Sequence, residues 1–442
     1  MSDNVLSIEK RTVSKVKRHI YPLMLVAYAF AFFDRMNISY ASLQMNKDLG
    51  LTATQFGLAA GLFFIGYLIF EVPSNMVMEK VGARFWMARI MIGWGIVSTC
   101  MMFVRGTTSL NILRLLLGIA EAGFYPGMIL YITYWFRDKD RGAAVSTLLI
   151  GAYIGGSVVS APLAGFILQM GGFLGLAGWK WLFLLEGLPS IVMGIIFIFA
   201  LVDRPEQAKW LEPEEKEWLV KTIAAENALK GKEEKHGLGA ILSSPRVWTL
   251  SLVYAFFGLA FYGLSFFLPQ IVRALAGGAH LVVVTTLASL PFMGVLFSLL
   301  VFAPHSDRTG ERHWHLVIGA IVAFIGLLVT SYSTSAVLSL TFLVIFGIGG
   351  GVFQPVFWAS STQFLRPKEV AIGVALINCL CALGGFAGPY MMGAIKDLTG
   401  TYRLGTLILA ICFLLAGVIM HVMFVRHKQE QRLVVGSLAK AE

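Results

Sequence analysis

The sequence has little charge. Aspartate, glutamate, lysine and arginine make up only 14% of its 442 residues, whereas 57% of the residues are hydrophobic. Soluble domains carry about 25% charged and about 45–50% apolar residues. Because a soluble surface this apolar would aggregate through exposed patches, the composition excludes an ordinary soluble domain and favours a protein embedded in a membrane.

Cysteines and enzyme motifs are scarce as well. All four cysteines lie in apolar stretches, which indicates neither a disulfide framework nor a metal site: Cys100, Cys379, Cys381 and Cys412. The sequence contains no metalloprotease, nucleophile-elbow or phosphate-loop motif. We therefore expect no enzymatic activity, no cofactor and no bound metal, and we expect the protein not to be an ATP-driven pump.

Long apolar runs are what the sequence has in abundance. A bilayer core about 30 Å thick needs roughly 20 apolar residues per helix. The first run holds Asp34 and Arg35 and lacks a small-residue cleavage site, so we interpret it as a retained span rather than a signal peptide. Twelve runs are long enough to span a membrane: 20–42, 56–78, 86–104, 109–136, 143–168, 181–202, 247–272, 281–303, 315–333, 336–358, 370–394 and 403–425.

Basic residues are distributed unevenly between the loops. Most lie in the two tails, the central stretch 203–246 and the loops on the same side, and this asymmetry explains the net charge of +10. By the positive-inside rule, we expect both termini and the central stretch to be cytoplasmic, and we expect no nucleic-acid partner. Six basic residues fall on the opposite side: Lys47, Arg105, Lys180, Arg273, Lys396 and Arg403.

The central stretch divides the runs into two sets of six. We expect an N-terminal six-helix bundle at 1–202, a cytoplasmic central loop at 203–246 and a C-terminal six-helix bundle at 247–442. Within the loop, Pro213 followed by acidic residues predicts a surface helix, because acids favour the positive end of the helix dipole. A flexible tail is expected to follow through residues 231–239.

A short motif recurs at equivalent positions in the two halves. Residues 79–84 follow the second run and residues 307–312 follow the eighth, and both read acid, base, any residue, glycine, any residue, arginine. The repetition favours an internal repeat, although each copy alone could be ordinary cytoplasmic loop charge. We expect a tight glycine turn and pairing of opposite charges, with gating or structural roles for Glu79, Arg84, Asp307, Arg308 and Arg312.

Charged residues inside the apolar runs are the main functional candidates. Each costs about 2.5–3.5 kcal/mol on insertion scales, so it is rarely kept without a purpose. The interiors of the last six runs hold none, and their polar residues are neutral, among them Tyr254, Tyr262, Gln354 and Asn378. The charged candidates lie in the first half: Asp34, Arg35, Glu71, Arg114, Glu121 and Glu186.

Four of these residues suggest substrate binding and proton coupling. The planar guanidinium of Arg35 matches a carboxylate, and the adjacent Asp34 can take up a proton. Glu121 falls near the centre of its run beside glycine and proline, as a proton carrier would, and Arg114 lies two turns before it on the same face. We expect each acid to have an arginine beside it. The alternative is a set of fixed structural ion pairs.

Two further acids and several aromatic residues receive other interpretations. Glu71 precedes Pro73 near the cytoplasmic end of its run, which favours a gating or structural role. Glu186 is interpreted as structural, because near the outer end of a run a charge can reach the interface. Tyr67 and Trp358 are candidate substrate contacts, although such aromatics are more often core residues.

Several of these segments resemble one known family. They match the anion:cation symporter family of the major facilitator superfamily, and the first run is most similar to its tartrate, phthalate and hydroxyphenylacetate permeases. One departure is that Asn75 and Ala303 stand where the superfamily's loop motif usually has glycine. The matching segments are 33–38, 71–75, 82–84, 121–127, 181–183, 186–189, 357–358, 378 and 384–389.

The resemblance implies an all-α membrane protein with twelve transmembrane helices in two six-helix bundles, the major facilitator fold. It also implies that Arg35 holds the substrate carboxylate, that Asp34 and Glu121 carry protons, and that Arg114 tunes them. Asn378 would contact substrate from the second half.

We therefore expect a monomeric, multi-pass inner-membrane symporter that imports a small organic carboxylate with protons by alternating access. The alternatives are an uncoupled facilitator or anion exchanger, a sodium-coupled symporter of the same fold, and a sensor or channel that keeps the fold. The full expected substrate site comprises Arg35, Tyr67, Tyr262, Gln354, Trp358 and Asn378.

The expected orientation can be tested by cysteine labelling. A cysteine introduced by Lys232→Cys should be protected from an impermeant maleimide in intact cells and labelled in inside-out vesicles, because the central loop is expected to be cytoplasmic. Lys180→Cys, on the opposite side, serves as the control and should show the reverse pattern. Labelling of the Lys232→Cys protein in intact cells would contradict the orientation.

Overall fold

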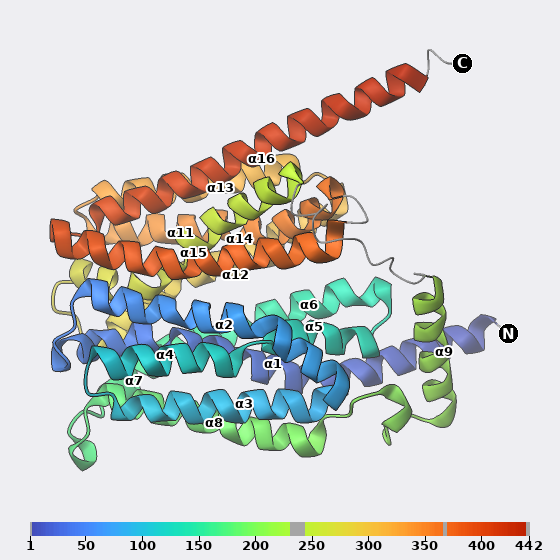
Figure 1. Cartoon of the computed structure of the whole chain (residues 1–442), viewed down its shortest axis with the longest axis horizontal. Helices are drawn as coiled ribbons and strands as arrows, with labels where there is room; N and C mark the ends of the chain where they lie inside the picture. Colours follow the sequence, from blue (N-terminus) through green and yellow to red (C-terminus); the bar gives the residue numbers. More distant parts are fainter. Residues whose placement is uncertain (1, 230–243, 366–368, 439–442) are drawn as a thin grey trace. The chain divides into compact units, whose positions relative to one another are not determined.

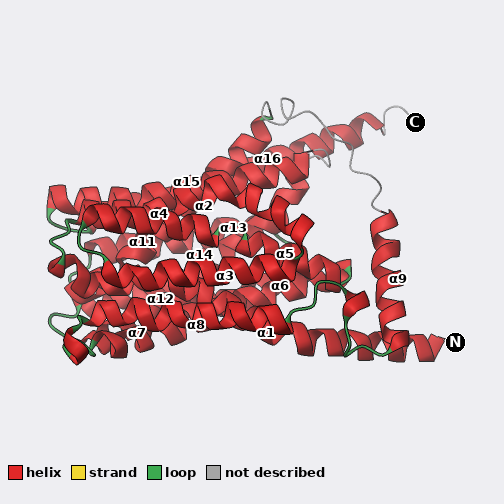
Figure 2. Cartoon of the chain, turned by 60° about the horizontal axis from the view of Figure 1, so that its bottom comes forward, coloured by secondary structure: helices red, strands yellow, loops and turns green. Residues whose placement is uncertain are grey.

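The computed structural model describes residues 2–229, 244–365 and 369–438. Within these ranges the chain is helical, with short turns and no β-strand (Figure 2). This confirms the all-α class expected from the apolar runs. The tail expected at residues 231–239 lies outside the described residues, as does Lys232. The helix expected at Pro213 is present as α9, Pro213–Leu229.

The described helices follow one another with short connections (Figure 1). The first group is α1 Ser2–Asp48, α2 Ala53–Val81, α3 Ala83–Cys100, α4 Thr107–Glu121, α5 Phe124–Trp135, α6 Asp138–Tyr153, α7 Ser160–Leu168, α8 Gly178–Ala200 and α9. The second group is α11 Pro245–Leu275, α12 Leu281–Thr309, α13 His313–Tyr332, α14 Ala336–Phe364, α15 Val370–Thr399 and α16 Arg403–Leu438.

Eleven helical segments of the described chain are long and apolar enough to cross a membrane. The remaining expected span lies within α1, whose apolar stretch is diluted by Asp34 and Arg35. Two of the eleven contain interruptions: α4 with α5 forms one, and α6, a π-helical stretch Ile154–Val159 and α7 form the other. The twelve-helix architecture is confirmed, and the interruptions are features that hydropathy could not predict.

The chain forms two compact units. One comprises Met1–Met45 and Ile65–Lys235, and the other comprises Asn46–Phe64 and His236–Glu442. The first turns of α2 therefore pack with the second unit, where the Asp397 carboxylate accepts hydrogen bonds from the backbone N–H groups of Ala53 (3.1 Å) and Thr54 (2.8 Å). A carboxylate at this position satisfies otherwise unpaired donors and complements the helix dipole.

Close helix packing in the second unit depends on glycine. A Cβ atom at Gly384 would lie 2.3 Å from the carbonyl oxygen of Ala255, and one at Gly388 would lie 2.2 Å from that of Leu259. These contacts join α15 to α11 at a separation that no larger residue permits. Glycines four residues apart thus allow these two helices to pack closely, as small residues do in membrane helix interfaces.

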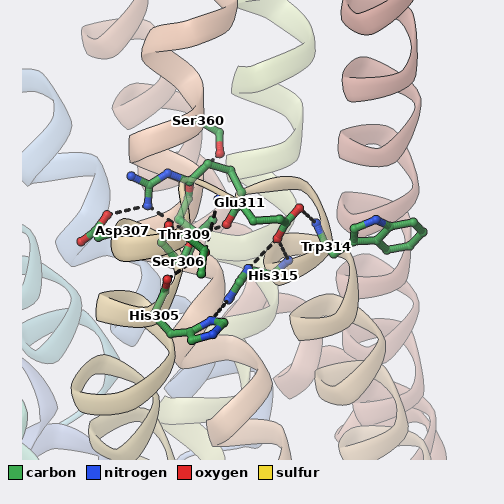
Figure 3. Close-up of polar contacts among 10 residues, drawn as sticks. His305, Ser306, Asp307, Thr309, Glu311, Trp314, His315 and Ser360 are labelled. Atoms are coloured by element: carbon green, nitrogen blue, oxygen red, sulfur yellow. Dashed lines mark hydrogen bonds and ion pairs between the residues drawn. The ribbon is translucent and has the colours of Figure 1, made fainter.

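The second copy of the repeated motif forms a compact loop between α12 and α13 (Figure 3). Gly310 has a φ of 69°, and the Arg312 guanidinium lies 2.5 Å from the Asp307 carboxylate. Glu311 accepts a 2.7 Å hydrogen bond from the backbone N–H of Trp314 and contacts His315, so it caps the start of α13. The expected glycine turn and charge pairing both occur in this copy.

The first copy makes its turn in the same way but pairs differently. Gly82 has a φ of 97°. Arg84 donates through Nε to the carbonyl oxygen of Ile198 on α8, and its backbone N–H donates to Asp203 at 2.8 Å. Glu79 is exposed. The link across the bundle is therefore made by the arginine and a backbone carbonyl rather than by the motif's own acid.

The start of α1 is bound to α9 by a buried acid. The Glu215 carboxylate, whose side chain is fully buried, lies 2.6 Å from Arg11 Nε and 2.9 Å from Lys15 Nζ. It also accepts a 3.0 Å hydrogen bond from the backbone N–H of Glu212. Burial raises the pKa of Glu215, but the hydrogen bonds from Lys15, Glu212 and Arg11 outweigh it, so the pKa lies below its usual value.

We expect Glu215→Gln to lower the free energy of unfolding by about 1–3 kcal/mol at pH 7, the typical loss when a buried, charge-assisted contact is removed. The pKa of Glu215 is lowered on folding, so its contribution is complete above the unfolded value of about 4.3 and disappears as the pH falls through the folded value. Thermal unfolding of the purified proteins at several pH values measures both effects. The exposed neighbour provides the control, Glu214→Gln, and equal stability of the two variants would contradict the assignment.

Candidate functional site

The fourth expected span is broken at its centre. Helix α4 ends at Glu121, Ala122 is extended (φ −54°, ψ 131°), and Gly123 adopts a left-handed conformation with a φ of 86° before α5 begins. A Cβ atom at Gly123 would lie 2.4 Å from Ser74 Oγ, so glycine is required here for two reasons. The prediction of a continuous helix over 109–136 is wrong at this point. The break places Glu121 at a helix end inside the bundle.

Arg35 of α1 forms an ion pair with Glu121. Its Nη2 donates to Glu121 Oε1, and the two side chains are 14% and 2% exposed, respectively. The guanidinium carbon of Arg35 also lies 5.6 Å from the centre of the Tyr67 ring, within cation–π range. The Glu121 side chain is therefore buried, whereas part of the Arg35 side chain remains exposed. Sequence reasoning proposed Arg35, Glu121 and Tyr67, and the structure brings them together.

Arg114 lies deeper in the same cluster. Its side chain is completely buried on α4, two turns before Glu121. Its charge interacts with those of Glu121, Asp34 and Arg35. A buried guanidinium with two acids nearby is compensated by them, because an isolated charge in the interior would cost several kcal/mol. The expected grouping of Arg114 with the acids is thus present in the structure.

Asp34 has different partners from those expected. Its carboxylate accepts hydrogen bonds from the Ser98 hydroxyl, from Asn37 Nδ2 at 2.9 Å and from Ser190 Oγ at 3.4 Å. No ion pair of Asp34 occurs among the described residues. The expectation that an arginine would lie directly beside each acid therefore holds for Glu121 and fails for Asp34, because Asp34 points toward α3 and α8 on another face of α1.

Glu186 of α8 is the acid that sequence reasoning misjudged. It was expected to reach the interface, but its side chain is only 3% exposed and both carboxylate oxygens are buried. It lies beside Asn37, within the influence of Asp34. A usable signal was present in the sequence, since Ser190 follows Glu186 by one helical turn and puts a second polar side chain on the same face of an apolar run.

Glu71 lies on α2 at the edge of this cluster. Its side chain is half-buried, and its charge interacts with that of Arg35. Its backbone carbonyl accepts a 2.9 Å hydrogen bond from Asn75 Nδ2. Pro73 leaves this part of α2 short of one backbone donor. The donor that Pro73 lacks would have served the carbonyl of Ile69, so the Asn75 hydrogen bond is an additional contact of this turn and does not replace the lost one.

In the second unit, Tyr254 of α11 organises a neutral polar cluster. Its buried hydroxyl accepts hydrogen bonds from Trp358 Nε1 at 3.0 Å and from Gln354 Nε2 at 3.3 Å, both on α14. Its ring stacks on Phe357 with the ring centres 4.7 Å apart. Two of the expected substrate contacts, Gln354 and Trp358, therefore share a hydrogen-bond partner, Tyr254, which is also one of the neutral polar residues of the last six apolar runs.

The other two candidates of this unit are Tyr262 and Asn378. The ring of Tyr262 packs against that of Phe64, with the centres 4.5 Å apart. The side chain of Asn378 on α15 is exposed. Among the described residues, no group of three or more histidine, cysteine, aspartate or glutamate side chains is arranged to hold a metal ion.

Comparisons with known proteins agree with this architecture. The sequence profile of the Major Facilitator Superfamily matches residues 24–389, with a second match at 278–437. An Agrobacterium vitis protein named "Putative tartrate transporter" is 45% identical over 398 residues, which cover 90% of this chain and 91% of that protein. The "Putative metabolite transport protein NicT" of Pseudomonas putida is 38% identical over 414 residues, covering 92% and 93%.

Solved structures support the fold. The crystal structure of a bacterial homolog of the human lysosomal transporter Spinster matches with a TM-score of 0.72 and 19% identity, covering 92% of this chain and 96% of that one. The chain therefore belongs to the Major Facilitator Superfamily. It is a multi-pass membrane transport protein and not an enzyme, and the names of its relatives agree with the anion-transporting branch that the sequence motifs resemble.

Proposed function

We propose that this transporter imports a small organic carboxylate together with protons by alternating access. The observation that carries the proposal is the Arg35–Glu121 ion pair. In this pair a partly exposed arginine is neutralised by a buried glutamate, which lies at the break between α4 and α5. The relatives named as tartrate and metabolite transporters support a carboxylate substrate. Discontinuous helices often form binding sites in transporters, which supports the location.

Arg35 serves as the anion-binding residue in this proposal. Its planar guanidinium can hold a carboxylate with two parallel hydrogen bonds, and Tyr67 provides an aromatic face beside it. In the described conformation Glu121 occupies one of its donors. An incoming carboxylate therefore competes with Glu121 for the same guanidinium.

This competition couples the substrate to a proton. When substrate takes over Arg35, Glu121 loses its hydrogen-bonded counterion while it remains buried. Arg114 alone then compensates the buried carboxylate less well than the two arginines together, so Glu121 binds a proton more readily. By linkage, protonation of Glu121 strengthens substrate binding to the same degree. Asp34 is proposed as a second coupling group, and Arg114 holds both acids in a positive environment.

The remaining assignments are also proposals. Tyr262, Gln354, Trp358 and Asn378 supply neutral contacts to substrate, and the ion pair and caps of the repeated loops serve gating or structural roles. The protein lies in the inner membrane as a monomer. Both of its termini are in the cytoplasm, an orientation that the basic residues of its loops favour. Uptake into liposomes under an imposed proton gradient, a sodium gradient or neither separates symport with protons from sodium coupling, facilitation and exchange.

We expect Arg35→Lys to weaken substrate binding by about 10–100-fold, because lysine keeps the charge but loses one hydrogen bond to a charged group, worth about 1.5–3 kcal/mol. Binding of a dicarboxylate such as tartrate to the purified protein, by calorimetry, measures the change. The exposed Arg105 provides a control, since Arg105→Lys should bind as the unmodified protein does. Unchanged affinity in Arg35→Lys would refute the assignment of this residue.

We expect Glu121→Gln to bind substrate and to exchange it in counterflow, yet to lose accumulation driven by a proton gradient. Glutamine resembles the protonated acid in shape but cannot release a proton. Asp34→Asn should behave similarly, with weaker binding. Liposome uptake with and without an inward proton gradient measures this, with the exposed Glu206→Gln as the control. Full gradient-driven accumulation in both variants would show that the acids are structural and would make Glu71 the next candidate.

A further inference from the structure

Four of the eight histidines of the chain meet in two pairs at the start of α13. His305, near the end of α12, contacts His315, with 2.9 Å between His305 Nδ1 and His315 Nε2 (Figure 3). His313 contacts His421 of α16, with 2.9 Å between His313 Nε2 and His421 Nδ1. Histidine rings therefore join the first turn of α13 to two other helices, and neither pair belongs to the proposed substrate or coupling residues.

The Glu311 carboxylate determines where one hydrogen of the first pair lies. Burial raises the pKa of Glu311, but hydrogen bonds from the Trp314 backbone N–H and from His315 outweigh it, so the pKa lies below its usual value. Glu311 is therefore ionised wherever histidine titrates, and an ionised carboxylate only accepts hydrogen bonds. The His315 Nδ1 atom lies 2.6 Å from Glu311 Oε2, so it carries a hydrogen, and the other ring nitrogen of His315 faces His305.

A hydrogen bond between two ring nitrogens holds a single hydrogen. If His305 donates, the Nε2 atom of His315 must present a lone pair, and His315 is neutral. If His315 donates, it is a cation, and His305 must present the lone pair and is neutral. The pair can thus carry no positive charge or one, whereas a second proton removes the acceptor and places two cations in contact. The same rule applies to His313 and His421, because they too face one another through ring nitrogens.

The elements around the two pairs carry further charged or titratable side chains. Helix α14, which packs against both α12 and α13, has none between Gln354 and its end at Phe364. Among the residue types concerned, histidine is the one that ordinarily changes charge between about pH 5 and 8, so its protonation is the expected response to acid here. The side chains close in sequence to the pairs are Asp307, Arg308, Glu311 and Arg312 in the loop and Arg426, His427 and Lys428 on α16.

The His305–His315 contact is one of the connections that close the loop between α12 and α13. The two histidines are ten positions apart, one on each side of the repeated motif. Between them, Ser306 Oγ donates to the Glu311 carbonyl oxygen at 2.6 Å, and Arg312 pairs with Asp307. Separation of the histidines would therefore remove the outermost of these connections and leave the ends of α12 and α13 less firmly joined.

We propose that the two histidine pairs make the start of α13 a sensor of cytoplasmic acid. When each pair takes up a second proton, its rings separate, the loop between α12 and α13 loosens, and import slows. The proposal rests on the proposed function, in which this loop lies in the cytoplasm with a gating or structural role and each cycle delivers protons to that side. Acid that accumulates through import thereby limits further import.

The variants that test the sensor replace one histidine of each pair. In the double variant His305→Asn with His421→Asn, each pair keeps one histidine and a side chain that can still hydrogen-bond but cannot gain a charge. Two cations can then no longer meet in either pair. The matched control is His280→Asn, because His280 is exposed and precedes the first residue of α12, at the opposite end of that helix from His305.

Amide hydrogen exchange of the purified protein, followed by mass spectrometry, tests the loop without relying on transport. We expect peptides covering residues 306–316 to lose protection in the unmodified protein between about pH 8 and about pH 5, the interval in which histidine changes charge. The double variant should keep more protection at the acid end, and His280→Asn should match the unmodified protein. Proteins are compared at the same pH, so the intrinsic pH dependence of exchange cancels. Equal loss of protection in the unmodified protein and the double variant would overturn the proposal.

Counterflow of labelled tartrate in liposomes, with the same pH on both sides, tests the effect on transport. The unmodified protein and His280→Asn should slow several-fold over the same pH interval, and the double variant should slow less. If the loop loses protection while the acid dependence of counterflow is the same in all three proteins, the histidines titrate without regulating transport and the sensor is refuted. Failure of the proposed function itself would appear separately, as absence of gradient-driven uptake by the unmodified protein at neutral pH, and hydrogen exchange would still report on the histidine pairs.

Discussion

The low polarity of the bundle interior is the constraint on which the functional site depends. A charge placed there loses its hydration, and it persists only when a partner or a proton offsets that loss. The first unit meets this requirement in two ways. Glu121 is balanced by Arg35 and Arg114, whereas Asp34 is surrounded by hydroxyl and amide donors. The same requirement makes the cluster sensitive to ligands. A ligand that draws the arginine away from a buried acid favours protonation of that acid.

Backbone geometry adds a second requirement at the same place. The left-handed Gly123 and the extended Ala122 separate α4 from α5, so the helical hydrogen-bond ladder is interrupted next to Glu121. Within a membrane, such an interruption is tolerated only where it is enclosed by protein or lines a polar space. Glu121 and the helix break are therefore compatible neighbours. The break provides polar backbone groups near the acid, and the acid provides a polar side chain near the break.

Much of the fold could be predicted from the sequence, because hydropathy and loop charge report directly on membrane spans. The rarity of charge in the apolar runs also identified Arg35, Glu121, Arg114 and Asp34. What could not be predicted was the partner of each residue, since this depends on how the helices are rotated about their axes. Asp34 and Arg35 are adjacent in sequence but contact different helices, and Glu186 proved to be buried where its position suggested an interfacial charge.

The ion pairs between the start of α1 and α9 have a consequence for how the protein is made. Arg11 and Glu215 are separated by 204 positions, so the acid is not synthesised until the helices of the first group are nearly complete. Until then, Arg11 and Lys15 lack this partner. Once α9 emerges from the ribosome, the same two residues join it and close the first unit. The contact that fixes the beginning of the first unit therefore forms only when the synthesis of that unit is nearly finished.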